Sequence, residues 1–279
     1  MSKKPAPRSL APTSPKQASS KKLSSKKPGS KTTSPKTVQK TPARPAANPR
    51  GLGDIPFPLP QVEASEKRRA RRLLAMLDEH YPDAICELDY TTPHELLVAT
   101  ILSAQATDVG VNKATPALFA RFPTPGDYAV ATPEEIEPYI RTIGLFRNKA
   151  KAIHAAMTEV VTRFGGQVPR TMDELLTLRG VARKTANVVL GNAYGVHVGF
   201  VVDTHIERLS KRFALCEAGD TVQAVERRLM ALFPRDRWTD ASHMIIWHGR
   251  RACTARGNGP CSDHPICKRF GARCDRARS

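Results

Sequence analysis

The first fifty residues contain no aspartate or glutamate, although they carry thirteen of the 44 lysines and arginines of the chain. Large apolar residues are nearly absent from this stretch, which is rich in Lys, Pro, Ser, Ala and Thr. Such a composition cannot bury enough apolar surface to offset the entropy of ordering the backbone. We therefore expect residues 1–60 to form a disordered basic tail that binds polyanions loosely through counterion release. A solvated extension without a specific role and a mitochondrial transit peptide are the alternatives.

No run of about eighteen apolar residues occurs in the 279-residue chain, which argues against a membrane-spanning helix. The N-terminus also lacks an apolar run that ends at a small-residue cleavage site, so we expect no secretory signal. These absences predict a soluble intracellular protein. We expect a monomer that is cytoplasmic and associated with the nucleoid in a bacterium, or nuclear or mitochondrial in a eukaryote. The formal net charge of +18 indicates a polyanionic partner such as nucleic acid or an anionic membrane surface.

Strand-like alternation of apolar and polar residues is absent as well. From Glu63 onward, apolar residues recur at spacings of three and four between helix start and stop signals. The short β-rich run at 196–202 is interpreted as a buried extended connector. The sequence therefore predicts an all-α fold, with helices that begin at Thr92-Pro93 and at Thr132-Pro133 and further helices at about 149–164, 171–178, 184–194, 205–213, 221–233 and 240–248.

Cysteines are few, but four of the six crowd into the last 27 residues. A reducing compartment argues against a disulfide framework. The four are separated by seven, five and six residues, and a set of four thiolates can bind zinc or an iron–sulfur cluster. The spacing alone does not choose between these metals, and free or damaged thiols are a further alternative. The predicted ligands are Cys253, Cys261, Cys267 and Cys274, whereas Cys86 and Cys216 are interpreted as small core residues.

The segment from 171 to 194 has the pattern of a helix–hairpin–helix. A short amphipathic helix leads to Gly180, whose tolerance of positive φ permits a tight turn, and a second helix begins near Lys184. Backbone N–H groups of the turn and the helix dipole suit a phosphate, which predicts binding to a DNA backbone without regard to sequence. By position alone, Lys184 would more often be a solvated charge or a phosphate contact than a nucleophile.

An aspartate follows nineteen residues after this lysine. Asp203 ends a short apolar run directly before a predicted helix, and Thr204 with Glu207 has the spacing of a capping box. The carboxylate could therefore cap the helix. It could also accept a proton or stabilise positive charge on a reacting sugar, and the two roles are compatible because a capping carboxylate is held rigidly. His205 is interpreted as structural.

Three blocks of this sequence together resemble the endonuclease III family of bifunctional DNA glycosylases: LSAQATDVGVNKAT at 102–115, RGVARKTANVVL at 179–190 and VDTHIERL at 202–209. The resemblance extends from about residue 65 to the C-terminus. It implies a six-helix domain at 86–197 that contains the hairpin. It also implies an iron–sulfur cluster domain formed by 61–85 and 198–279, with a DNA cleft between the two.

The resemblance also assigns roles to individual residues. Lys184 matches the Schiff-base lysine and Asp203 the catalytic aspartate. Gln105 matches a residue that enters the space left by a flipped nucleotide, and Leu145 a wedge beside the unpaired base, unless Leu145 is an ordinary core residue. Such insertion offsets part of the unstacking cost of about a few kcal/mol. The hairpin residues expected to bind DNA are Arg179, Gly180, Val181, Ala182 and Arg183.

Two features depart from the family pattern. Where the family has Leu-Pro-Gly-Val-Gly, this chain has Arg179 and Ala182 at the second and fifth positions. Because alanine tolerates positive φ less well than glycine, we expect a strained or altered turn. The cysteine spacing is also wider than the family's six, two and five residues. The resemblance nevertheless implies a [4Fe–4S] cluster with a structural role.

The function implied by the resemblance is base excision repair. The enzyme would remove oxidised pyrimidines from double-stranded DNA and cut the strand 3′ to the abasic site by β-elimination through a lysine Schiff base. One alternative is a monofunctional relative, such as an adenine glycosylase that acts on mispairs, and Lys184 argues against it. A DNA-binding protein without catalytic activity is the other.

Overall fold

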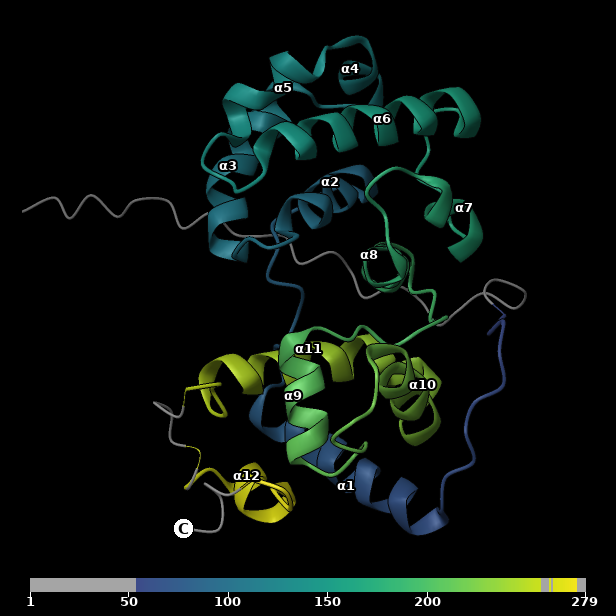
Figure 1. Ribbon diagram of the computed structural model, residues 1–279, viewed down its shortest axis with the longest axis vertical. Helices are drawn as coiled ribbons and strands as arrows, with labels where there is room; N and C mark the ends of the chain where they lie inside the picture. Colours follow the sequence, from purple (N-terminus) through teal and green to yellow (C-terminus); the bar gives the residue numbers. More distant parts are fainter. Residues whose placement is uncertain (1–53, 257–260, 262, 275–279) are drawn as a thin grey trace, which may run out of the picture. The chain divides into compact units, whose positions relative to one another are not determined.

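The computed structural model describes residues 54–256, 261 and 263–274. The chain divides into two units, 1–41 and 42–279, and the described residues all belong to the second. All of their regular secondary structure is helical, with no strand, which confirms the predicted all-α class (Figure 1). None of the described helices is long and apolar enough to cross a membrane. Most of the predicted tail lies outside the described residues.

Twelve α-helices and two shorter helical segments make up the described part of the chain. Six of the α-helices begin after a threonine whose hydroxyl accepts a hydrogen bond from the N–H of the third helical residue, which satisfies a donor that the helix leaves unpaired. The α-helices are α1 (Ala64–His80), α2 (Pro93–Ser103), α3 (Asp108–Arg121), α4 (Pro125–Val130), α5 (Pro133–Ile140), α6 (Phe146–Phe164), α7 (Met172–Thr177), α8 (Arg183–Val189), α9 (Thr204–Arg212), α10 (Val222–Leu232), α11 (Trp238–Arg251) and α12 (Pro265–Phe270).

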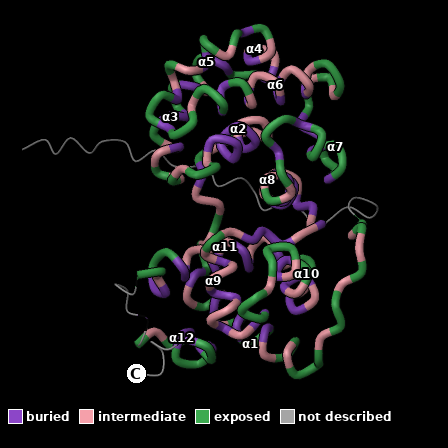
Figure 2. The backbone as a smooth tube through the Cα atoms, in the orientation of Figure 1, coloured by how far each residue is buried: buried purple, intermediate pink, exposed green. Residues whose placement is uncertain are grey.

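Helices α2 to α8 share one hydrophobic core, built from residues between Leu88 and Val198. Helix α2 is central to it, because all seven residues from Leu96 to Leu102 are buried and the helix contacts α3, α6 and α8. Helices α4 and α5 both pack along α6 (Figure 1). Figure 2 shows α2 as largely buried, in contrast to the exposed outer faces of α4 and α5.

Helix α1 and helices α9 to α12 share a second core, in which Trp238 and Phe213 are among the largest fully buried side chains. Residues 54–63 precede α1 without helical structure, and Ile55, Phe57 and Leu59 pack against this core. Residues 54–60 therefore have a defined path, whereas the sequence places them in the disordered tail. The alternation of apolar residues with proline explains the difference, since it presents one apolar face. The predicted domain boundaries remain a prediction.

The helix predicted at 184–194 changes type along its length. It runs as α8 to Val189 and then continues as a π-helix, Leu190–Tyr194. A Cβ on Gly191 would lie 2.4 Å from the Thr239 hydroxyl oxygen, so this turn packs directly against the start of α11. Such a contact between distant segments is invisible to a pattern search. Single π turns within helices are frequent at functional sites.

Candidate active site and metal centre

The hairpin turn connects α7 to α8 through residues 178–182. Gly180 has φ of 81°, and a Cβ there would approach the Cβ of Ala152 to 3.1 Å, so both backbone angle and space require glycine. Ala182 has φ of −97° and ψ of 170°, an extended conformation that any residue adopts. The expected strain at Ala182 is therefore wrong, because the turn needs positive φ only at Gly180.

Lys184 and Arg179 are both exposed around this turn. Lys184 lies in the first turn of α8, whose N-cap residue Ala182 supplies no side-chain hydrogen bond to the helix N–H groups. Val181 is buried, so its side chain serves packing, although its backbone N–H donates to Leu178 O at 3.1 Å. The turn thus presents a lysine amine and a guanidinium on its exposed side.

Arg183, the residue before Lys184, forms an ion pair with a residue of α10. Its Nε lies 3.0 Å and 2.9 Å from the two carboxylate oxygens of Glu226 on α10. Only 8% of the Glu226 side chain is exposed, so this ion pair is largely removed from water. The sequence groups Arg183 with the DNA-binding residues, a role that remains a prediction, whereas the structure occupies its guanidinium with a buried carboxylate.

Asp203 is the N-cap of α9. Its Oδ1 accepts a hydrogen bond of 2.8 Å from the N–H of Ile206, as the N-cap interpretation predicts. Glu207 pairs with Lys211 at 2.7 Å instead of completing a capping box. The Asp203 side chain is half-buried, with its second oxygen outside this hydrogen bond. Lys184 and Asp203 thus stand near the two ends of one stretch of chain, formed by α8, the π-helix and the connector 195–203.

Gln105 and Leu145, the predicted insertion residues, share an uncommon backbone conformation. Their φ angles are 55° and 59°, and among the described non-glycine residues only Ala214 also has positive φ. Leu145 is 59% exposed, which excludes the alternative that it is an ordinary core residue. A left-handed leucine costs about 1–3 kcal/mol and persists only where its surroundings impose it, often at functional sites.

A buried lysine joins the two turns that carry these residues. Lys149, in the first turn of α6, donates from Nζ to the carbonyl of Leu102 at 2.9 Å, close to the C-terminus of α2. Its backbone N–H donates to the carbonyl of Leu145 at 3.0 Å. Burial lowers the pKa of Lys149. One residue therefore contacts both the segment before Gln105 and the Leu145 turn.

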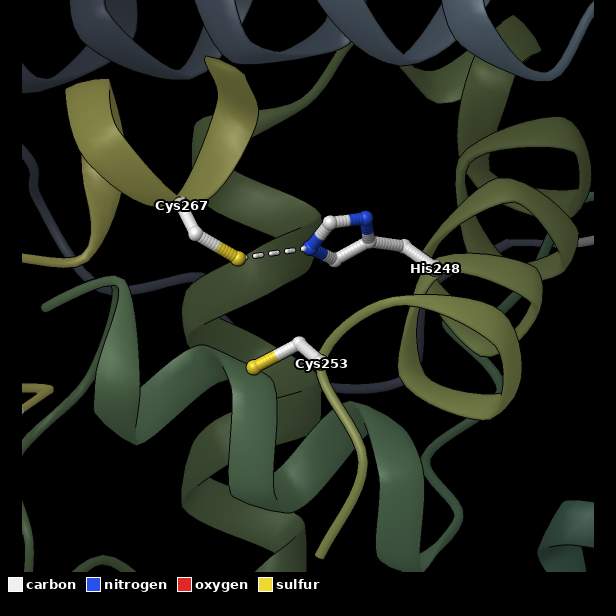
Figure 3. Close-up of side chains that lie close together, drawn as sticks. All are labelled: His248, Cys253 and Cys267. Atoms are coloured by element: carbon white, nitrogen blue, oxygen red, sulfur yellow. Dashed lines mark hydrogen bonds between the residues drawn. The ribbon is translucent and has the colours of Figure 1, made fainter. Parts of the chain in front are cut away.

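The four C-terminal cysteines are all buried. The Sγ of Cys261 lies 3.6 Å from that of Cys253 and 3.7 Å from that of Cys267. His248 lies beside them on α11, and Figure 3 shows its ring directed at the sulfur of Cys267 on α12. Ligand atoms of His248, Cys253 and Cys267 all lie within 4.8 Å of one another. Residues from three separate segments thus converge on one buried sulfur-rich centre.

Hydrogen-bond donors surround these sulfur atoms. Arg212 on α9 donates to the Sγ of Cys253 at 3.0 Å. The hydrogen bond from Cys267, assisted by Arg212, lowers the pKa of the Cys253 thiol to about 5. Burial, together with two nearby histidines, lowers the pKa of His248 to about 3 and keeps its ring neutral. With the Tyr81 hydroxyl donating to Nδ1 at 2.8 Å, the His248 Nε2–H can donate to Cys267 at 3.2 Å.

This donor set fits a metal–thiolate centre, because metals bind thiolates and the surrounding N–H groups stabilise their negative charge. The sulfur separations near 3.7 Å match the edge of a tetrahedron with bonds of about 2.3 Å, as in zinc sites. A four-iron cubane holds its thiolate sulfurs further apart, roughly 6 Å, so the cysteine side chains would have to spread around it. The chemistry of the residues therefore accommodates either group.

The sulfur-rich centre is connected to Asp203 through α9. Arg208 on this helix donates to the carbonyls of Gly249 and Cys253 at 3.0 Å and 2.8 Å. Arg212, one turn later, donates to the carbonyl of Thr254 at 3.1 Å and to the Cys253 sulfur. Loss of order around Cys253 would therefore remove hydrogen bonds that help to hold α9, the helix that Asp203 caps.

Sequence reasoning missed four residues that the structure places at these sites: Lys149, Arg212, Glu226 and His248. Two of them had a detectable signal. Lys149 precedes Ile153 and Met157 at helical spacing, and Glu226 occupies the same face of α10 as Leu229 and Met230. A charged residue on the apolar face of a helix is buried and needs a partner. The partner itself lies far away in sequence and could not be named.

Comparison with known proteins identifies the family. Residues 98–235 match the HhH-GPD superfamily of base excision DNA repair proteins. Endonuclease III of Synechocystis is 54% identical over 193 residues, which cover 69% of this chain and 88% of the relative. The chain belongs to the endonuclease III family. As a member of this family, the protein is a DNA glycosylase and AP lyase of base excision repair.

Two solved endonuclease III structures match the fold. A non-covalent endonuclease III–DNA complex has a TM-score of 0.71 and 43% sequence identity, covering 76% of this chain and 99% of that one. A trapped endonuclease III–DNA covalent intermediate has a TM-score of 0.68 and 44% identity, covering 72% and 93%. These matches confirm the helical endonuclease III fold, and the DNA bound in both neighbours supports DNA as the ligand of this chain.

Proposed function

We propose that the protein excises oxidised pyrimidines from duplex DNA and then cuts the strand 3′ to the abasic site through a Schiff base on Lys184. The observation that carries this proposal is the exposed Lys184 amine in the first turn of α8, directly after the Gly180 turn of the hairpin. The trapped covalent endonuclease III–DNA intermediate supports it, because that relative forms a bond to DNA.

The reaction needs a nucleophilic amine and a carboxylate. The unprotonated Lys184 amine attacks the sugar carbon that bears the base, and the base leaves with a proton. Asp203 accepts a proton from the amine or stabilises positive charge on the sugar as the base leaves. The sugar ring then opens to a protonated Schiff base. This cation acidifies the adjacent sugar carbon, whose proton is lost as the 3′ C–O bond breaks, and water finally releases the lysine.

The exposed turns supply the remaining requirement, access to a stacked base. Extrusion costs about a few kcal/mol, which a side chain that enters the vacated space offsets in part. Gln105 and Leu145 are exposed on backbones that hold them in fixed, left-handed conformations. We assign Gln105 to the space of the flipped nucleotide and Leu145 to the wedge, while Arg179 and the N–H groups of the hairpin turn bind phosphate.

Strand cleavage of a duplex with a single abasic site tests the proposed function. Purified protein should cut this substrate without added metal, and borohydride should convert the Schiff base into a stable protein–DNA adduct. A folded protein that binds the duplex but neither cuts it nor forms the adduct would leave only a DNA-binding role. Excision assays with thymine glycol, dihydrouracil and mispaired bases then define the substrate and separate this enzyme from a monofunctional adenine glycosylase.

The wedge assignment predicts a selective defect. Leu145→Gly keeps the left-handed backbone, which glycine adopts freely, but removes the side chain. We expect the rate of base excision from duplex DNA to fall about 10-fold or more. The reason is that the leucine side chain no longer compensates about 1.4 kcal/mol of the free energy of unstacking. Cleavage of a single-stranded abasic site, which needs no extrusion, should change little. Equal losses on both substrates would contradict a wedge at Leu145.

We propose that the four cysteines hold a [4Fe–4S] cluster with a structural role, and zinc is the alternative that the sulfur separations favour. When bound, the group would cross-link Cys253, which follows the end of α11, to Cys261, to Cys267 on α12 and to Cys274. A broad blue-region absorbance and four irons per chain would identify the cluster. A colourless protein with one zinc would identify the alternative.

Removal of one ligand should expose the structural role. Cys267→Ser is expected to lower the metal content and to reduce the melting temperature by about 5 °C or more, since the free energy of metal binding stabilises the fold. Cys86→Ser, in the other core, is the matched control and should keep the full metal content. If Cys267→Ser retained the metal, Cys267 would not be a required ligand, and His248 would be the nearest candidate to replace it.

A further inference from the structure

The Arg183–Glu226 pair lies where three segments of the chain meet. Asn187, one turn after Arg183 on α8, donates from Nδ2 to Glu226 Oε1 at 3.0 Å. The Arg183 Nη2 lies 3.4 Å from the carbonyl of Val198, in the connector that leads to Asp203. Glu226 itself belongs to α10, so one buried carboxylate joins α8, the connector and α10.

The connector packs closely against this network. A Cβ at Gly199 would lie 2.3 Å from Glu226 Oε1 and 2.5 Å from both terminal atoms of the Asn187 side chain. The backbone at Gly199 therefore rests directly on the buried pair, four residues before Asp203. Any movement of the Glu226 carboxylate would shift either the connector or the start of α8.

The guanidinium of Arg183 also contacts an aromatic ring. Besides Glu226 and Val198, its Cζ lies 4.9 Å from the centroid of the Phe57 ring, and the Cζ of Arg227 lies 4.4 Å from the same ring. Only 27% of the Arg183 side chain remains exposed. A phosphate contact through Nε would require this arginine to leave a carboxylate that is almost completely buried, and an unpaired buried charge is strongly unfavourable.

We propose that Arg183 and Glu226 are positioning residues that fix the Lys184 amine relative to the Asp203 carboxylate, and that Arg183 does not contact DNA. The proposal rests on the function assigned above to Lys184 and Asp203. Arg183 precedes the lysine directly, while the Val198–Gly199 segment sets the path to the aspartate. The ion pair thereby holds the segments that carry the two reacting groups. Displacement of a reacting group by about 1 Å can lower the rate roughly 100-fold.

Two measurements separate positioning from phosphate binding. The first is the slope of log Kd against log salt concentration on a duplex with a reduced abasic site, which cannot form a Schiff base. The second is the single-turnover rate of borohydride trapping at saturating enzyme. A lost phosphate contact reduces the slope by about one. A lost positioning contact lowers the trapping rate and leaves the slope unchanged.

Arg183→Gln and Glu226→Gln are the test variants, and Arg179→Gln is the matched phosphate-contact variant from the same turn. We expect the first two to keep the wild-type salt slope and to trap about 10- to 100-fold more slowly. Arg179→Gln should show the reduced slope, which Arg183→Gln and Glu226→Gln should lack. The double variant Arg183→Gln/Glu226→Gln should be no slower than either single variant, because both remove one shared contact.

The outcomes distinguish failure of this proposal from failure of the proposed function. If the wild-type protein forms no adduct, the function itself is overturned. If the wild type traps normally and Arg183→Gln reproduces the reduced slope of Arg179→Gln at full rate, Arg183 is a phosphate contact. A wild-type rate in Glu226→Gln also overturns the proposal. Melting curves show whether each variant is folded, and Glu226→Gln, which keeps shape and removes the buried charge, carries the test if Arg183→Gln does not fold.

Discussion

Lys184→Gln should retain DNA binding but lose strand cleavage at an abasic site by about 1,000-fold or more, and it should form no borohydride adduct. The reason is covalent: the glutamine amide cannot form a Schiff base, and no oxygen of the protein can replace the nitrogen in the β-elimination. The exposed position of Lys184 predicts an unchanged melting temperature, because its side chain makes no packing contact that the fold depends on.

A matched surface variant makes this result interpretable. Lys67→Gln removes one exposed positive charge from α1, on the other core, and should cleave and trap as the wild type does. Adduct formation by Lys184→Gln at the wild-type yield would transfer the nucleophile to another amine. Loss of DNA binding together with cleavage would mean that Lys184 acts mainly as a phosphate contact.

Asp203→Asn should reduce excision of a damaged base by about 100- to 10,000-fold, the range typical of a lost general base or acid. Asparagine caps helices as well as aspartate does, so the hydrogen bond to the Ile206 N–H and the stability of α9 should persist. The substitution thereby separates the chemical role of the carboxylate from its structural role, because it removes the charge and keeps an oxygen that can cap the helix. Cleavage of a preformed abasic site should fall less, because the base has already left.

Asp203→Ala provides the second comparison, since it removes the cap as well as the charge. It should lose a further 1 kcal/mol, approximately, of unfolding free energy relative to Asp203→Asn, measured by denaturant titration. Equal activity in Asp203→Asn and the wild type would restrict Asp203 to capping. An activity loss proportional to the stability loss in both variants would also restrict Asp203 to capping.

The local chemistry of the chain was readable from the sequence. Threonine–proline pairs at 92–93 and 132–133 predicted helix starts, and both threonines cap their helices as expected. Gly180 was identified as the turn residue, and Asp203 as an N-cap. Each of these depends on backbone angles and hydrogen bonds within a few residues, so the necessary information is contained in a short window of sequence.

Long-range contacts decided the rest. The sequence did not predict the π-helix that follows α8, where Gly191 packs against Thr239, a residue distant in sequence. It also did not predict the ion pair between Arg183 and Glu226, which lies 43 residues away. A lone arginine has the same local pattern whether it faces phosphate or a buried carboxylate.

The sequence by itself determined the helical class, the hairpin, the candidate lysine and aspartate, and the four clustered cysteines, because residue type and spacing carry that information. Only the tertiary structure decided which charges are buried against each other, how closely the sulfur atoms of Cys253, Cys261 and Cys267 approach, and that Leu145 is exposed on a left-handed backbone. The physical reason is that burial and distance are properties of segments brought together by the collapse of the whole chain, and no segment specifies its partner alone.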